Sequence, residues 1–378
     1  SVIPLLMAPK ILVVGAGFAG CVIARELAEA GVDVHVIDRR PHLGGNAFDQ
    51  VNAHGERVHL YGPHLLHGDG DSTAIRWLSR FTEWMPYEHR VRALLPDGRT
   101  TPLPVNRTTL EDVFNVVLHQ EEEARQLLSQ EVVNSERRNT DEVFLSSVGP
   151  RLADLFFRPY TRKMWGVDAS QLEAAVGARL PVRLNRDDRY FTDSFQAMPR
   201  DGFAAMFERI LNHERISISL NEAYRPELDN GYIHTFLGVP IDEYFDFRFG
   251  RLPYRSIRFE NVEQREDQAA TVVNFTDAGP YTRITQWDLI ANSGRRLDGF
   301  HSCTREIPCD PKENNQECYY PVRNGDSLSL YGCYEELAGR EERRTFIGRT
   351  GLFRYIDMVP CVNIHLQIAA RFRDNLFG

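Results

Sequence analysis

Three glycines near the amino terminus have the spacing of a loop that holds a pyrophosphate. Gly15 permits a tight turn, Gly17 lets the backbone approach the phosphates, and Gly20 lets a helix pack closely against a strand. The first N–H groups of that helix then face the phosphates. Asp38 follows Gly20 at the distance where a carboxylate accepts hydrogen bonds from a ribose diol. These residues predict a dinucleotide cofactor; a glycine-rich turn without a ligand is the alternative.

The elements around these residues form a βαβ unit. Lys10–Val14 is a short apolar run typical of a buried parallel strand, and Cys21–Ala30 has helical character up to Gly31. Val32–Ile37 is a second strand, and it ends at Asp38. The glycine spacing therefore lies at a strand-to-helix turn, which is the context that a pyrophosphate loop needs.

NAD and FAD share this fingerprint, so the choice between them depends on later residues. Gly44 and Gly45 follow Asp38 closely, where a flavin site needs chain near the cofactor. Residues 348–358 follow a predicted strand at Thr345–Gly348, a junction that commonly closes over the flavin in flavoproteins. Both observations favour FAD.

The rest of the chain changes character twice. Residues 72–157 are mostly helical, with a hairpin over Val91–Thr101 and a capping box in which Thr108 is the N-cap and Glu111 its partner. Further helices are expected over 120–141, 141–157 and 362–374, and short strands over 216–220, 244–249, 256–260, 271–275 and 282–287. The strands predict an antiparallel sheet. The fold class is therefore α/β: a Rossmann-like FAD-binding domain with a helical insertion and an antiparallel-sheet substrate domain.

The composition argues against several classes of partner. Forty-four Lys and Arg face 53 Asp and Glu, a net charge of −9 without a basic stripe, so no nucleic-acid partner is expected. No apolar run approaches the roughly 20 residues of a membrane-spanning helix, so no membrane partner is expected. The six cysteines have neither a CxxC pair nor a disulfide-framework spacing, which favours a reduced, cytoplasmic setting.

A series of motifs occurs in one order along the chain. They are YGPHLLH at residues 61–67, YTRKMWG at 160–166, RLPVR at 179–183, DDRYF at 187–191, MPRDG at 198–202, PIDEYF at 240–245, YTR at 281–283, YYP at 319–321 and the segment 348–358. This series resembles the UDP-galactopyranose mutase family from about residue 10 to 370. The expected domains are a discontinuous FAD-binding unit (8–71, 196–235 and 320–378), a helical unit (72–157) and an antiparallel-sheet substrate unit (158–195 and 236–319).

The resemblance implies a flavin-dependent mutase that interconverts UDP-galactopyranose and UDP-galactofuranose, or a closely related nucleotide hexose. In that reaction N5 of reduced FAD attacks the anomeric carbon and displaces UDP, and the sugar recloses as a five-membered ring with no net redox change. The furanose serves cell-wall and other cell-surface glycan biosynthesis. The family also implies a homodimer, although the sequence identifies no interface.

By resemblance, Arg179 and Arg283 hold the departing diphosphate, whose growing negative charge is stabilised by fixed guanidinium groups. Tyr190, Tyr320 and Tyr355 are similar to family tyrosines that donate hydrogen bonds to the same phosphates. The alternative for each tyrosine is a buried core position with a satisfied hydroxyl.

Four further aromatic residues belong to the expected substrate site. The resemblance assigns Phe156, Phe157 and Tyr160 to a nucleobase pocket, although the helical spacing of Phe156 and Tyr160 also suits core packing. Trp165 borders the sugar. It precedes a segment similar to the family's mobile lid, residues 166–178, whose closure brings the first of the two arginines to the diphosphate and excludes water.

His59, His64 and His67 raise the question of a metal site. No carboxylate or thiol accompanies them and the family uses no metal, so no metal is expected. The preferred interpretation is a loop facing the flavin, in which His64 influences the electronics of the isoalloxazine. The expected cofactor contacts are Gly15, Gly17, Phe18, Ala19, Gly20, Asp38, Arg39, Gly45, Asn46, His64, Arg349, Asp357 and Met358.

Four positions depart from the family pattern. Met164 stands where Gln is usual before Trp, Gly68 where Thr is common, and Gln286 where Glu is usual. Val239 gives the segment before Pro240 one residue more than the usual Thr-Gly-Pro. The departures indicate another nucleobase or sugar, such as an N-acetylated or deoxy hexose, or drift within the family.

Two other functions stay open at this point. One is an FAD-dependent oxidoreductase of the amine-oxidase-like type on the same scaffold, and the other is a flavin-binding protein without catalysis. The two arginines and three tyrosines argue against the oxidoreductase, because an apolar substrate site does not need them.

Overall fold

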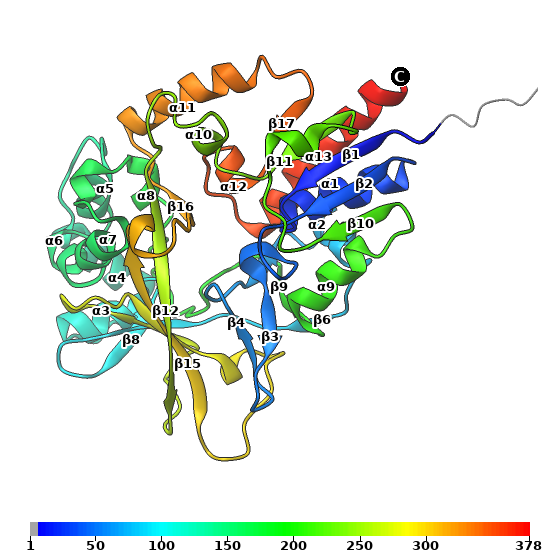
Figure 1. Ribbon diagram of the computed structural model, residues 1–378. Helices are drawn as coiled ribbons and strands as arrows, with labels where there is room; N and C mark the ends of the chain where they lie inside the picture. The colour runs from blue at the N-terminus through cyan, green and yellow to red at the C-terminus, as the bar shows by residue number, and fades with distance from the viewer. Residues whose placement is uncertain (1–6) are drawn as a thin grey trace, which may run out of the picture.

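The computed structural model describes residues 7–378 and contains two large sheets (Figure 1). The first is a five-stranded sheet in the order β10-β2-β1-β11-β17, with every pairing parallel. Its strands are β10 (Ile216–Ser219), β2 (Asp33–Ile37), β1 (Lys10–Val14), β11 (His234–Leu237) and β17 (Arg344–Phe346). The predicted βαβ unit is confirmed, with α1 (Phe18–Glu29) between β1 and β2. The predicted strand at 216–220 exists, but it joins this parallel sheet and not the antiparallel one.

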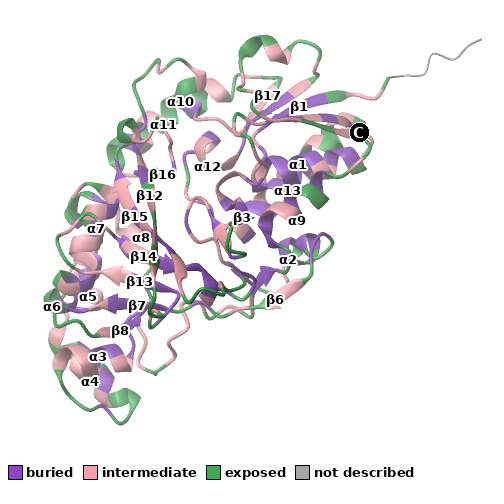
Figure 2. Cartoon of the chain, turned by 60° about the horizontal axis from the view of Figure 1, so that its bottom comes forward, coloured by how far each residue is buried: buried purple, intermediate pink, exposed green. Residues whose placement is uncertain are grey.

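Strand β1 is buried on both faces, which explains its continuous apolar run (Figure 2). Ile11 and Val13 belong to one core cluster, and Leu12 and Val14 belong to another. The first cluster includes residues of α1, α2 (Thr73–Leu78), α9 (Gly202–Leu211) and α13 (Met358–Phe377), and the second includes residues of α10 (Ile241–Tyr244) and α11 (Gly325–Ala338). Helices therefore cover both faces of the sheet, as in a doubly wound fold.

The second large sheet has seven strands in the order β16-β12-β15-β14-β13-β7-β8. They are β16 (Tyr320–Pro321), β12 (Tyr254–Gln264), β15 (His301–Cys309), β14 (Arg283–Gln286), β13 (Val272–Phe275), β7 (Val91–Leu94) and β8 (Thr100–Leu103). All pairings are antiparallel except that of β13 with β7. The predicted hairpin over Val91–Thr101 is confirmed as β7–β8, with Gly98 in the left-handed region at φ +87°.

Short helices pack around one end of the seven-stranded sheet. They are α3 (Arg107–Phe114), α4 (Glu121–Glu131), α5 (Thr140–Ser147), α6 (Pro150–Leu152), the π-helical turn η2 (Ala153–Phe157), α7 (Arg158–Trp165) and α8 (Ala174–Gly177). Residues of α3 to η2 share a core cluster with the strands β7, β8 and β13. The expected helical unit 72–157 is therefore divided between the two large sheets. Helix α2 packs in the core of the first sheet, and β7 and β8 are strands of the second. The division into three domains stays a proposal.

Two small sheets lie between the large ones (Figure 1). They consist of β5 (Leu66–Gly68), β9 (Phe195–Pro199) and β6 (Trp84–Pro86), and of β3 (Asp49–Val51) with β4 (Arg57–His59). None of the described helices combines the length and the apolar character that a bilayer crossing requires.

The predicted cap of the helix at residue 107 is wrong. Asn106, not Thr108, is the N-cap: its side chain accepts from the N–H of Thr109, and the Thr109 hydroxyl accepts from the N–H of Asn106. Glu111 accepts instead from the N–H of Leu118. The threonine hydroxyl thus takes the role that the prediction gave to Glu111.

Two longer predictions also fail. A single helix over 141–157 is broken at Gly149, which adopts φ +84° between α5 and α6. A strand over 244–249 is replaced by α10 and a turn, in which the buried carboxylate of Asp242 accepts from the N–H groups of Glu243 and Leu252. Local side-chain hydrogen bonds of this kind compete with strand formation, and the aromatic pattern did not reveal them.

Candidate active site

The glycine turn lies at the carboxyl end of β1. Gly15 adopts φ +105°, and a Cβ on Gly20 would lie 1.8 Å from the carbonyl oxygen of Gly15. A Cβ on Gly17 would lie 3.6 Å from the Cα of Gly45, so the two chain segments are close together. Among the described residues, no side chain caps the first turn of α1. The turn therefore offers free N–H groups at a helix N-terminus, the arrangement that binds phosphate.

Asp38 ties this turn to the end of β2. Its Oδ2 accepts from the N–H of Ala16 at 2.8 Å and its Oδ1 from the N–H of Arg40 at 2.9 Å. Each carboxylate oxygen can accept a further hydrogen bond, so Asp38 can also bind a ribose diol.

Three other predicted cofactor residues have protein partners. Arg39 forms an ion pair with Glu317 at 3.0 Å, and Asn46 accepts from the guanidinium of Arg40 at 2.9 Å. The ring of Phe18 is buried against two phenylalanines of α9, so only its backbone can face a ligand.

The segment 348–358, which follows β17 near the carboxyl terminus, lies against the glycine turn. A Cβ on Gly348 would lie 3.5 Å from the Cβ of Ala19. Asp357 and Met358 begin α13, and no described side chain caps its first turn. The N-terminus of α13 borders the cavity described next, and its dipole favours negative charge there.

A cavity of about 750 Å³ is lined by the seven-stranded sheet, the helical cluster, the loop at 61–67 and the start of α13. This size is typical of a small-molecule site. Of the predicted residues, its lining contains His64, Phe156, Phe157, Tyr160, Trp165, Arg179, Tyr190, Arg283, Tyr320, Arg349, Tyr355, Asp357 and Met358. The fold thus brings together residues that are far apart in the sequence. The residues from Gly15 to Asn46 lie outside this lining.

Arg283 is a cation held in place from one side of the cavity. The register of β14 with β15 places it opposite Glu306, and its Nε donates to Glu306 Oε2 at 2.6 Å. The side chain of Glu306 is 2% exposed. Burial lowers the pKa of Arg283, but Glu306, Tyr160 and Tyr320 together raise it by more, so the net pKa lies above the ordinary value. Glu306 could not be predicted from the sequence, because only the strand register makes it a partner of Arg283.

Arg179 has a different environment. It is exposed and lies directly after the segment 166–178, which contains α8 and resembles the family's lid. Its guanidinium carbon lies 4.9 Å from the centre of the Tyr355 ring. Within the described part of the chain, no carboxylate lies within ion-pair distance of it. Arg179 therefore remains available for an anion in the cavity.

Aromatic rings and a third guanidinium form one wall of the cavity. The rings of Tyr320 and Tyr355 are stacked with centroids 5.8 Å apart, and Arg349 lies over both, at 5.2 and 4.7 Å. Trp165 meets Tyr320 edge-on at 6.5 Å. Burial raises the pKa of Tyr355 above its ordinary value. Its hydroxyl therefore stays protonated at neutral pH and can donate a hydrogen bond.

The expected nucleobase residues combine both interpretations that the sequence left open. Phe156 is 4% exposed and belongs to the core cluster of the helical region, yet it also lines the cavity. Phe157 packs against Phe144 at 5.2 Å. Burial raises the pKa of both Tyr160 and Tyr190. The hydroxyls of these two tyrosines therefore also remain donors at neutral pH.

The three histidines at the end of β4, in the following loop and in β5 have different partners. His59 Nδ1 accepts from the N–H of His64 at 3.0 Å, His64 Nδ1 faces the carbonyl of Gly62 at 2.9 Å, and His67 Nδ1 faces Asp193 at 3.2 Å. Burial lowers the pKa of His59 to about 3 and that of His64 to about 4. Both rings are thus neutral at pH 7.

Comparison with known proteins decides the family. The family model described as UDP-galactopyranose mutase matches residues 155–355. The probable UDP-galactopyranose mutase of Klebsiella pneumoniae is 38% identical, over 97% of this chain and 95% of that protein. This chain belongs to the UDP-galactopyranose mutase family.

Two further comparisons agree with this assignment. The dTDP-fucopyranose mutase of Escherichia coli is 35% identical over 97% of this chain and 99% of that protein. A crystal structure of reduced UDP-galactopyranose mutase superposes with a TM-score of 0.71 at 16% identity, over 99% of this chain and 94% of that chain. A model for NAD(P)-binding Rossmann-like domains matches residues 13–81. The predicted α/β fold class and FAD as the cofactor are confirmed.

Two departures from the family pattern have a local physical reason. Met164 is buried against Ile257 in a small core cluster that borders the cavity. A Cβ on Gly68 would lie 3.1 Å from a methyl group of Val359, so a threonine there requires Val359 to shift. Val239 packs in the core on the other face of the parallel sheet, and nothing in the structure explains its insertion.

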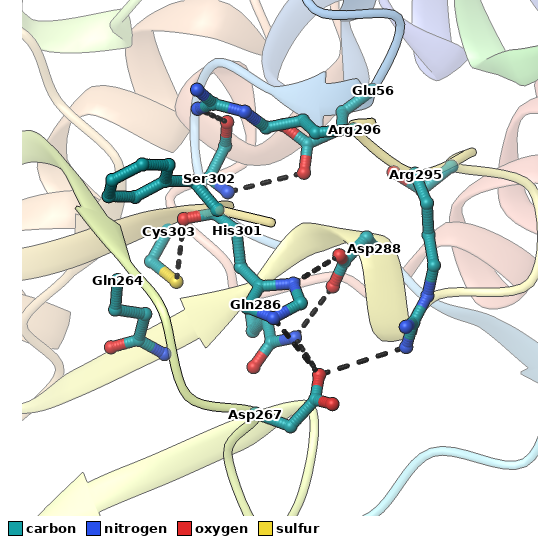
Figure 3. A network of polar contacts seen from close by, with 12 residues as sticks. Glu56, Gln264, Asp267, Gln286, Asp288, Arg295, Arg296, His301, Ser302 and Cys303 are labelled. Atoms are coloured by element: carbon teal, nitrogen blue, oxygen red, sulfur yellow. Dashed lines mark hydrogen bonds and ion pairs between the residues drawn. The ribbon is translucent and has the colours of Figure 1, made fainter. Parts of the chain in front are cut away.

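Gln286, the fourth departure, lies in a polar network away from the cavity (Figure 3). Its Nε2 donates to Asp267 at 2.8 Å and to Asp288 at 2.6 Å, and its Oε1 accepts from the N–H of Gln268 at 2.7 Å. That backbone N–H fixes the orientation of the amide, so its NH₂ group points at both carboxylates. A glutamate at this position would place a third carboxylate beside them.

The same network contains a group that the sequence analysis missed. Ligand atoms of Asp267, Asp288 and His301 lie within 4.8 Å of one another, a spacing that could hold a metal ion. His301 Nδ1 lies 2.6 Å from Asp288 and its Nε2 3.5 Å from Asp267. Because the NH₂ group of Gln286 also points into this group, hydrogen bonds already bind the carboxylates. The arrangement is that of a hydrogen-bonded cluster.

Proposed function

We propose that the protein is a mutase that uses reduced FAD to interconvert UDP-galactopyranose and UDP-galactofuranose or a closely related nucleotide hexose. The observation that carries this proposal is the cavity, where Arg179, Arg283 and three tyrosines surround a space next to the N-terminus of α13. Such a site suits a diphosphate beside a flavin. The furanose product would serve cell-surface glycan biosynthesis.

The residues at the glycine turn fit FAD. Gly17 and Gly45 let two chain segments lie close together at the turn where the N–H groups would hold a pyrophosphate, and Asp38 can accept hydrogen bonds from a ribose. When bound in its reduced form, FAD supplies the nucleophilic N5 atom for the anomeric carbon of the sugar. The N-terminus of α13 stabilises negative charge at the cavity end of such a cofactor.

The protein's own part is to bind and stabilise the diphosphate as it leaves the sugar. Arg283 is oriented before substrate arrives, because Glu306 holds its Nε and leaves its terminal nitrogens for an anion. Preorganised cations of this kind stabilise charge that develops in the transition state. Arg179 adds a second guanidinium when the segment 166–178 closes over the site, and this closure excludes water.

The aromatic residues position the substrate. Tyr190, Tyr320 and Tyr355 donate hydrogen bonds to the phosphates, and Trp165 borders the sugar. Phe156, Phe157 and Tyr160 bind the nucleobase. His64 is a neutral ring beside the flavin and influences its electronics. The flavin contacts of Gly15, Gly17, Gly20 and the other residues predicted from the sequence belong to the same proposal.

Which sugar and which base the substrate carries is a narrower question than which reaction is catalysed. Met164 replaces a usual glutamine with an apolar side chain at the edge of the cavity, which favours a less polar group on the substrate. The relative named dTDP-fucopyranose mutase supports a dTDP-linked deoxy hexose as the second candidate substrate. We also propose a homodimer and a cytoplasmic location, and the six unpaired cysteines within the described residues support a reducing compartment.

A turnover assay tests the proposal. The purified yellow protein is reduced with dithionite and incubated with UDP-galactofuranose, and UDP-galactopyranose is measured by chromatography. Conversion that requires the reduced flavin supports the mutase. Bleaching of the oxidised flavin by a substrate without isomerisation would support the amine-oxidase-like alternative, and flavin binding with neither result would support a non-catalytic protein. A panel of UDP-, dTDP- and GDP-hexoses then ranks the substrates.

A further inference from the structure

One imidazole nitrogen in the cavity has no partner in the protein. His89 precedes β7, is 3% exposed and lines the cavity together with Arg283 and Tyr190. Its Nδ1 lies 3.0 Å from the hydroxyl of Tyr87. Among residues 7–378, nothing forms a hydrogen bond with its Nε2. Nε2 is not one of the fully enclosed side-chain atoms that lack a hydrogen-bond partner, so it is open to the cavity, and a ligand there can reach it.

The surroundings of His89 make it rigid. Its carbonyl oxygen accepts from the N–H of Tyr190 at 2.7 Å, and the Tyr190 ring meets the imidazole edge-on at 5.7 Å. The ring of Phe191 lies 6.3 Å away on another side, and His67 is stacked on Phe191 at 3.5 Å. The imidazole is therefore held by neighbours on several sides while its Nε2 remains free.

The partner on the other ring nitrogen determines what Nε2 can do. The Tyr87 hydroxyl also lies 2.7 Å from Oγ1 of Thr271, and it has one proton to donate. If that proton goes to His89, Nε2 carries the ring proton and donates. If it goes to Thr271, His89 donates through Nδ1 and Nε2 accepts. A ligand hydroxyl, which both donates and accepts, suits either state.

The surroundings of His89 favour an uncharged ring, which attracts an anion less than a guanidinium does. Burial, together with the charges of Arg283 and His67, lowers the pKa of His89 to about 3. The ring is therefore neutral at pH 7, unlike the guanidinium beside it. A neutral group next to the diphosphate site is suited to the uncharged sugar that the diphosphate carries.

We infer that His89 Nε2 forms a hydrogen bond with a hydroxyl of the transferred hexose and thereby selects the sugar. This inference rests on the proposed function, since it assumes that a nucleotide sugar fills the cavity. A site built to hydrogen-bond a hydroxyl rejects an analogue that lacks it, because the protein group is then left unpaired. His89 is thus a specificity-determining residue that the motif comparison did not include.

Two substitutions at position 89 distinguish the contribution of Nδ1 from that of Nε2. In His89→Asn, the shorter amide reaches the position of Nδ1 and keeps the contact with Tyr87, but it does not replace Nε2. In His89→Gln, the longer amide reaches the position of Nε2. Flavin absorbance and the thermal midpoint of each variant report whether the fold and the cofactor are retained.

The experiment measures kcat/KM of the reduced protein for UDP-galactopyranose and for its 2-, 3- and 6-deoxy analogues. The 4-deoxy sugar is left out, because O4 closes the furanose ring. For one analogue we expect the unaltered protein and His89→Gln to lose roughly three- to tenfold relative to the parent sugar, the value of one hydrogen bond. We expect His89→Asn to have the same kcat/KM for that analogue as for the parent sugar.

The inference is overturned if every analogue shows the same ratio to the parent sugar in His89→Asn as in the unaltered protein. The same ratios are measured as dissociation constants by calorimetry. If turnover is absent, the proposed function fails, but the binding ratios still decide the role of His89.

Discussion

The two arginines that we assign to the diphosphate are held in opposite ways. Arg283 lies on a strand of the seven-stranded sheet, and the buried Glu306 on the neighbouring strand fixes it. Arg179 follows α8 and is exposed, and its guanidinium lies over the face of Tyr355. The difference suggests that half of the diphosphate site exists before substrate binds and that the other half forms on closure. The fixed half should dominate catalysis, and the mobile half should dominate capture of the substrate.

The largest effect is expected from Arg283→Ala. Loss of a preorganised anion ligand typically costs roughly 2.7–4 kcal/mol of transition-state stabilisation, so kcat should fall about 10²- to 10³-fold. Flavin absorbance should be unchanged, because Arg283 is not among the residues of the glycine turn. Stopped-flow or steady-state assays of the reduced protein measure this, and near-normal kcat would refute the phosphate role.

Arg179→Ala should have the next largest effect. Hydrogen bonds to charged groups contribute roughly 1.5–3 kcal/mol, so kcat/KM should fall about 10- to 100-fold, with a larger share in KM than for Arg283→Ala. Arg179→Lys is the matched control and should recover only part of the loss, since an ammonium cannot bind a diphosphate in a bidentate manner. Equal shares of kcat and KM in both alanine variants would contradict the distinction between the two halves.

Glu306→Gln tests what fixes Arg283. The substitution removes the counter-charge of a guanidinium that is partly hydrated by the cavity. We therefore expect about 2 kcal/mol lower unfolding free energy, below the 3–5 kcal/mol typical of a fully buried pair. Activity should fall about tenfold, the equivalent of 1.4 kcal/mol. Denaturant unfolding and turnover measure the two effects, and an unaltered kcat would show that Arg283 does not need Glu306.

Acid should destabilise the fold through the buried His59. The pKa of His59 is near 6.5 in the unfolded chain and about 3 in the folded protein. Between these values the unfolded state binds a proton that the folded state does not, so stability falls as the pH is lowered through this window. His59→Asn keeps an acceptor for the N–H of His64 without titrating. Its unfolding free energy should lose roughly 2.5–3 kcal/mol less between pH 6.5 and 4, and a parallel pH profile would contradict this.

The smallest effect is expected away from the cavity. Asp288→Asn replaces the carboxylate that contacts His301 in the network of Figure 3. The weaker hydrogen bond should lower the unfolding free energy by about 1 kcal/mol. Since Asp288 does not line the cavity, kcat should change less than about twofold. A large loss of kcat would show that the network supports the active site. Tighter binding of a divalent cation to the unaltered protein than to Asp288→Asn would restore the metal interpretation.

The elements that could be predicted from the sequence are those with a local signal. The glycine turn depends on residues within about thirty positions, and its strand, helix and acidic residue were all found. The hairpin at Gly98 has an equally local cause, a left-handed turn between two strands. The residues of the cavity wall came instead from the order of the family motifs, since nothing local brings Arg179 and Arg283 to one site.

What escaped prediction depends on long-range register or on single backbone conformations. Glu306 lies on an ordinary strand, and only its pairing with β14 makes it the partner of Arg283. His89 precedes β7 and belongs to none of the motifs named above. Only the fold shows that it lines the cavity, where its Nε2 can contact a ligand. Gly149 ends a helix that the apolar pattern continues, because a left-handed residue interrupts the helix whatever the pattern.

A crystal structure of the reduced protein with UDP tests the central claim most directly. The account predicts that the diphosphate lies within hydrogen-bonding distance of Arg283, which keeps its ion pair with Glu306, and that Arg179 has moved to contact the same phosphates. A diphosphate bound elsewhere, or bound without contact to Arg283, would contradict it.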